Sequence, residues 1–187
     1  MFDFLKRKPK PIKYVCASCK EEHEGLPSLG YKLPRHYFEV PENERDERIE
    51  HDTDFCVIQP SETSLNQHVI YSIRTELHIP VKGIDEYISI GLWVSQSEEK
   101  FKLYYDTFEE DQSDFLSFGW LTLHMPYYKT LTDEGNLLSL ACDVKGRGDN
   151  QRPLLHIQKT DHPLYYDTHN GVSLKKAYKI SAELLHS

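Results

Sequence analysis

The segment "YVCASCKEEHEG" (residues 14–25) contains two thiols and an imidazole close together, at Cys16, Cys19 and His23. A Cys-x-x-Cys pair can bind one zinc ion from a single turn of backbone, and His23 can supply a third ligand. A structural zinc has four protein ligands, whereas three ligands and a water make a Lewis-acid site that activates the water. The number of protein ligands therefore decides between a structural and a catalytic ion.

The fourth ligand has to come from a distant part of the chain. Cys56 and His51 lie near the start of the expected sheet, and His162 and His169 lie in a segment rich in polar residues. The residues alone do not rank these candidates.

Two interpretations without a metal remain open at this stage. A Cys-x-x-Cys pair can be redox-active where a helix N-terminus lowers the thiol pKa, but the acidic residues in "KEEHEG" (20–25) oppose thiolate formation. The two cysteines can also be simple unligated thiols in a loop.

Other polar clusters offer general acid-base chemistry. Asp161-His162 and Asp167-Thr168-His169 place carboxylates beside imidazoles. The chain has no G-x-S-x-G, phosphate-loop or H-E-x-x-H motif. One enzymatic alternative is therefore a metal-dependent hydrolase that uses the Cys/Cys/His zinc site, assisted by Asp161, His162 or His169. "KGRGDNQ" (145–151) is predicted to be a loop and is assigned no role.

Charge and composition limit the function further. A formal charge of -8 argues against a nucleic-acid binder and suits a basic protein partner. No apolar run approaches the roughly 18 residues of a membrane span, and the N-terminus lacks a secretory signal, so we expect a cytoplasmic protein. Composition does not set the oligomeric state.

The patterning predicts residues 1–13 as a flexible basic tail and residues 14–187 as a single domain. Residues 68–81 alternate, with Ile73, Leu77 and Ile79 on one face and Arg74 and Glu76 on the wetter one, and should pair with residues 87–97 as a hairpin. The patterning also predicts strands at 54–59, 115–125, 136–144 and 153–158 and helices over 97–110 and from 173 onward. It predicts a loop or extended segment at 160–172. The expected fold is α+β, a mainly antiparallel β-sheet with one crossing helix and a C-terminal helix.

Several motifs in order resemble the bacterial domain of unknown function DUF2199, from about residue 14 to about residue 180. They are "CASCKEEHEGLP", "DFCVI", "IRTELHIPV", "GLWVSQS", "FGWLTLHMPYYKTL" and "TDHPLYYDTHNGV". Two positions depart from the family pattern as we know it. Lys20 replaces the glycine that often follows the second cysteine, and Thr168-His169 replaces a Gln-Arg pair.

The resemblance implies a zinc site made by the family's motif thiols, Cys16, Cys19 and Cys56, together with His23 or His162. Such an ion would join the N-terminal segment to the sheet. The resulting hypothesis is a non-enzymatic bacterial binding or regulatory protein with a structural zinc, for example a toxin-neutralising immunity protein.

Overall fold

The structure is a computed structural model, which describes residues 13–15, 19–26, 28–61, 68–123, 125–132 and 135–185. The predicted tail lies outside these residues except for Lys13, which begins the first strand. The strands are β1 (Lys13–Val15), β2 (Glu22–Glu24), β3 (Ser28–Gly30), β4 (Ile49–His51), β5 (Phe55–Ile58), β6 (Ile70–Pro80), β7 (Tyr87–Gln96), β8 (Leu116–Thr122), β9 (Ser139–Lys145) and β10 (Leu154–Ile157). The helices are η1 (Arg35–Glu39), η2 (Glu42–Glu44), α1 (Arg45–Arg48), α2 (Glu98–Asp106), α3 (Pro163–Asn170) and α4 (Leu174–Leu185). The α+β class is confirmed.

The predicted hairpin between β6 and β7 is confirmed, with Cα partners running from Tyr71–Gln96 to Pro80–Tyr87. Successive side chains of a strand point to opposite faces. Accordingly, Ile73, Leu77 and Ile79 are buried, while Arg74 and Glu76 on the other face are half-buried. The alternation read from the sequence therefore placed both faces of β6 correctly.

The sheet is not a simple open antiparallel sheet, because its strands close into a barrel. Within the described residues, each strand from β6 to β9 pairs antiparallel with the strand that follows it in the chain. The last strand, β10, then pairs parallel with β6 and closes the ring. The closing contact aligns Leu154 with Glu76, and the Glu76 amide donates to the Pro153 carbonyl at 2.9 Å. β5 and β4 extend the sheet from the start of β6, and β3 pairs parallel with the start of β7.

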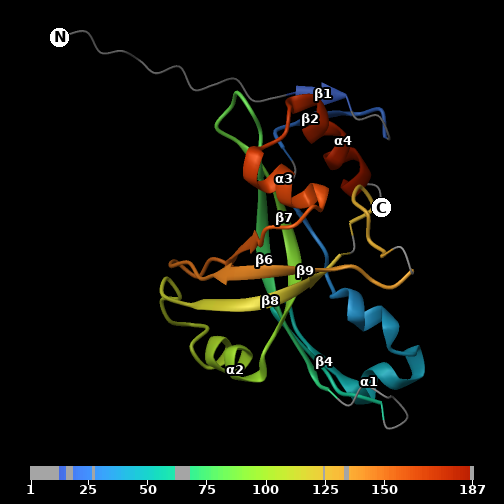
Figure 1. The fold of residues 1–187 in the computed structure, drawn as a ribbon, viewed down its shortest axis with the longest axis vertical. Helices are drawn as coiled ribbons and strands as arrows, with labels where there is room; N and C mark the ends of the chain where they lie inside the picture. Colours follow the sequence, from blue (N-terminus) through green and yellow to red (C-terminus); the bar gives the residue numbers. More distant parts are fainter. Residues whose placement is uncertain are drawn as a thin grey trace, which may run out of the picture.

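The interior of the barrel and the apolar faces of the helices form one hydrophobic cluster. Phe101 and Tyr104 of α2 belong to it, and so do Ala177 and Ile180 of α4. Cys142 of β9 is fully buried in the same cluster, as expected of a small apolar side chain. Figure 1 shows α3 and α4 at one end of the long strands, and α1 with β4 at the other.

The prediction of a loop or extended segment over residues 160–172 was wrong, because most of it is helix α3. Pro163 occupies the first turn, where a missing N–H costs nothing, and His162 is the N-cap. Gly171, with φ 67°, follows the last helical residue in a conformation that favours glycine. Asn170 and Gly171, near the end of the segment predicted as a loop, are thus the end of a helix.

Candidate functional site

The structure brings Cys19 and His23 together. β1 and β2 pair antiparallel, and the Cys19 Sγ lies 3.1 Å from His23 Nε2. Lys20 between them has φ 65°, a left-handed conformation that favours glycine. This position is the one where the resembled family often has glycine. Cys16 lies outside the described residues.

Cys56 lies in an apolar environment. It is fully buried on β5 in a small cluster with Val40, Ile58 and Trp93. Burial, reinforced by the charge of Asp52, raises the pKa of the Cys56 thiol to about 12. The side chain is therefore a neutral thiol in this structure.

His162 uses both ring nitrogens in contacts within the protein. Its Nδ1 accepts a hydrogen bond from the Leu164 amide at 3.2 Å, and its Nε2 lies 3.1 Å from the Lys129 carbonyl oxygen. A carbonyl only accepts, so Nε2 carries the proton and the ring is neutral. Burial accordingly lowers the pKa of His162.

Within the described part of the chain, no three His, Cys, Asp or Glu side chains form a group that could hold a metal. Cys19, His23, Cys56 and His162 therefore do not converge among these residues. The predicted zinc site depends on Cys16, and it stays a prediction.

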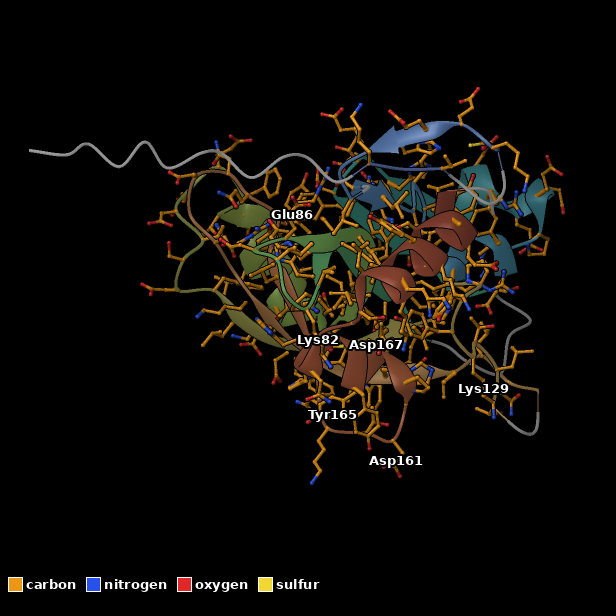
Figure 2. All side chains as sticks on the ribbon, turned by 90° about the horizontal axis from the view of Figure 1, so that it is seen from above. Lys82, Glu86, Lys129, Asp161, Tyr165 and Asp167 are labelled. Carbon is orange, nitrogen blue, oxygen red and sulfur yellow. The ribbon has the colours of Figure 1, made fainter. Side chains whose placement is uncertain are left out.

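The other predicted acid-base residues do not pair with one another. Asp161 accepts from the Tyr166 hydroxyl at 3.3 Å and lies at the edge of the molecule, while Asp167 lies further inward (Figure 2). Asp167 accepts from the Tyr128 hydroxyl at 2.9 Å and from Lys176 Nζ at 2.7 Å. These bonds join α3 to α4 and to the segment between β8 and β9, which indicates a structural role.

A cavity of about 1360 Å³ opens beside the wetter face of β6. Its lining comes from β3, the turn between β4 and β5, β6, β7, the end of α2 and the loop between β9 and β10. The side chains that carry its chemistry are Asp54, Arg74, Glu76, Ser89, Arg147 and Arg152.

Glu76 is held by several donors. Ser89 Oγ and Arg147 donate to its two oxygens, and His78 Nε2 lies 3.0 Å from Oε1. Burial alone would raise the pKa of this carboxyl. The hydrogen bonds from Ser89 and Arg147, the close contact of His78 and the charge of Arg147 outweigh burial and lower the pKa of Glu76 to about 2. Glu76 is therefore ionised at neutral pH and is not a general acid.

Glu76, His78 and Ser89 do not form a nucleophile triad. In such a triad the imidazole lies between the hydroxyl and the carboxylate. Here the Glu76 carboxylate lies between Ser89 and His78, so His78 is not placed to take the Ser89 proton.

Asp54 makes the second ion pair of the cavity. Its Oδ1 accepts from Arg152 Nε at 2.6 Å and its Oδ2 accepts from the Thr53 hydroxyl at 2.8 Å. Burial would raise the pKa of Asp54, but the bonds from Arg152 and Thr53 and the charges of Arg152 and Arg74 outweigh it, and the pKa is lowered.

Arg74 differs from the other two arginines of this group. Its guanidinium donates from NH1 to the Thr53 carbonyl at 3.3 Å, and its buried Nε has no hydrogen-bond partner in the part of the chain that the structure describes. Among the described residues no carboxylate lies within ion-pair distance of it, whereas Arg147 and Arg152 are paired. Burial, with repulsion from Arg152, lowers the pKa of Arg74 despite the attraction of Asp54.

The sequence reasoning missed most of this site. Arg147 belongs to the "KGRGDNQ" loop, which was assigned no role, yet it lines the cavity and pairs with Glu76 on β6. Asp149 and Asn150 both have positive φ and fold the loop back, so that Arg147 Nε donates to the Arg152 carbonyl at 2.6 Å. The available signal was the pair of charges at Arg74 and Glu76 on the wetter face of β6.

A family model described as an uncharacterized protein conserved in bacteria, DUF2199, matches residues 15–172. The chain belongs to this family. The DUF2199 match includes every residue that lines the cavity. No curated protein and no solved structure gives a significant match. In the described part of this DUF2199 protein, no helix is long and apolar enough to cross a membrane.

Proposed function

We propose that the protein is a non-enzymatic binding domain, and that a small molecule binds in the cavity beside β6. The observation that carries this proposal is the convergence of charged side chains from β6, the β4–β5 turn and the β9–β10 loop on a cavity of about 1360 Å³. Small-molecule sites are concave and place a few polar groups with precision on a rigid scaffold.

The chemistry of the lining favours binding over catalysis. Glu76 and Asp54 are held ionised by arginines, so neither can donate a proton at neutral pH. Ser89 donates to the Glu76 carboxylate, whose lowered pKa makes it a weak base for that hydroxyl. Fixed charges of this kind orient a ligand.

Native mass spectrometry of protein purified without detergent or heat tests the proposal. We expect a mass above that of the chain, which disappears when Gln151→Trp fills the mouth of the cavity. Lys179→Trp, on the exposed face of α4, is the matched control and should keep the added mass. The same added mass in wild type and Gln151→Trp, or no added mass in either, would contradict the proposal.

We further propose a structural zinc that Cys16, Cys19 and His23 bind together with a fourth protein ligand, supported by the 3.1 Å contact between Cys19 and His23. The cavity lining includes neither Cys19 nor His23, so a water-activating role for this ion has less support than a structural one. Emission spectroscopy on protein purified without a metal-affinity step should find about one zinc per chain, and much less in Cys19→Ser. A small fraction of one zinc per chain in the wild type would end the idea.

A basic protein partner, such as a toxin, is proposed from the net charge of -8. The genes that neighbour the gene of this protein test the proposal of a toxin partner directly. A secreted toxin is expected beside the gene, and its absence would argue against an immunity role.

A further inference from the structure

We propose that Arg74 binds an oxyanion, the carboxylate or phosphate group of the small molecule, at the wall of the cavity formed by β3, β6 and β7. This inference rests on the proposed function and names the chemical group that the cavity recognises. Three steps lead to it.

The first step is the pairing of the three arginines that line the cavity. Arg147 pairs with Glu76 and Arg152 pairs with Asp54. Lys32, Asp52 and Glu109 also line the cavity, so its lining as a whole carries as many negative as positive side chains. Among the described residues, Arg74 is the arginine of this lining that has no carboxylate within ion-pair distance.

The second step is that the carboxylates nearby are already engaged. Both oxygens of Asp54 accept hydrogen bonds, from Arg152 and Thr53. Both oxygens of Glu76 are also engaged, by Ser89, His78 and Arg147. The charge of Asp54 attracts the Arg74 guanidinium, but neither carboxylate lies within ion-pair distance of it, and a partly buried guanidinium without a close partner is costly. An anion from outside the chain would remove that cost.

The third step is the shape of the strands around Arg74. Gly30 of β3 and Gly91 of β7 are directly paired beside the guanidinium. A Cβ added at Gly30 would lie 2.7 Å from Arg74 NH2, and one at Gly91 would lie 3.5 Å from Arg74 Nε. The two glycines therefore leave room for the guanidinium to lie against the strands. The central carbon of the Arg74 guanidinium, Cζ, lies 6.0 Å from the centre of the Trp93 ring.

The planar fork of an arginine matches the oxygens of a carboxylate or phosphate, which is why an oxyanion is the chemistry assigned here.

Two measurements test the binding of an oxyanion at Arg74. The Nε–H signals of the arginines are followed by ¹⁵N NMR while inorganic phosphate or acetate is added at constant ionic strength, with chloride as the reference. The signal absent from Arg74→Gln identifies Arg74.

We expect at least one of the two anions to shift the Arg74 signal in a saturable way, together with the amides of Gly30 and Gly91. The probe with the greater affinity assigns the group as phosphate or carboxylate. The affinity should fall about tenfold or more in Arg74→Gln, because a charge-assisted hydrogen bond is lost. Gly30→Ala, which keeps the charge but displaces NH2, should also weaken binding, and Lys179→Gln should not.

The melting temperature of the unliganded protein separates binding from a structural role. If Arg74 serves the ligand, Arg74→Gln melts no lower than the wild type. A clear drop in the melting temperature, or anion binding of equal strength in Arg74→Gln, would overturn the inference. If neither anion shifts the Arg74 signal while the mass added to the native protein persists, the assignment of an oxyanion to Arg74 is wrong, and the proposal of a binding domain is retained. If that mass is missing as well, both proposals fail.

Discussion

At the scale of single residues, the cavity is organised by two carboxylates that the fold keeps ionised. Alternation predicted that Arg74 and Glu76 share the wetter face of β6, and the structure confirms it. Their partners could not be predicted, because Arg147 and Arg152 reach them from a loop whose path depends on two residues with positive φ. Such long-range pairing leaves no periodic signal in a sequence.

The pKa of Glu76 gives a prediction for stability. It is lowered from 4.5 to about 2, so its stabilising effect is present above pH 4.5 and is lost as the pH falls from 4.5 toward 2. We expect Glu76→Gln to lower the free energy of unfolding by about 2 kcal/mol at pH 7, after allowance for solvent screening of this partly exposed side chain. Urea unfolding at pH 7 and pH 3 measures the free energy of unfolding of both proteins. The difference in this free energy between wild type and Glu76→Gln should be smaller at pH 3 than at pH 7. Glu183→Gln, exposed on α4, is the control, and a gap unchanged between the two pH values would contradict the assignment.

At the scale of elements, strands β5 to β10 and helices α2 and α4 follow from periodicity, whereas the short strands β1 to β4 and helix α3 did not. It is only 8 residues long, and its polar and tyrosine-rich sequence has a weak apolar stripe. Its boundaries were nevertheless signalled by Pro163 at the start and Gly171 at the end. The segment that contains both residues was predicted instead as a loop or extended segment.

His162 holds the start of α3, and its loss should be measurable. His162→Ala removes the bonds to the Leu164 amide and the Lys129 carbonyl, and should destabilise the fold by about 1–3 kcal/mol. Burial lowers the pKa of His162 from 6.5, so its contribution is present above pH 6.5 and declines as the pH falls below that value. The penalty measured by chemical unfolding should therefore decrease below pH 6.5. His169→Ala, at the exposed end of the same helix, should change stability much less; equal effects would argue against the cap.

At the scale of the whole molecule, the α+β class was predictable but the closure of the barrel was not. A ring of five consecutive strands, each antiparallel to the next, has an odd number of members, so its first and last strands must run in the same direction. β6 and β10 do so, and the alignment of Leu154 with Glu76 closes the ring within the described chain. Strand patterns in a sequence give the strands but not the parallel pair that joins distant ones.

The closure also explains where the cavity lies. β6 changes its neighbour along its length, from β5 at its start to β10 near Glu76, and Arg74 lies where that change occurs. The Arg74 amide donates to the Asp54 carbonyl and the Glu76 amide to the Pro153 carbonyl, both at 2.9 Å. The β4–β5 turn and the β9–β10 loop thus meet at the same stretch of β6, and each contributes an ion-pair partner.

A crystal structure of the protein as purified tests this account most directly. It should show electron density for a bound molecule in the cavity beside β6, with oxygen atoms within hydrogen-bond distance of the Arg74 guanidinium and with the Arg147–Glu76 and Arg152–Asp54 pairs intact. An Arg74 side chain turned into an ion pair with Asp54 or Glu76, beside a cavity closed by neighbouring side chains, would contradict it.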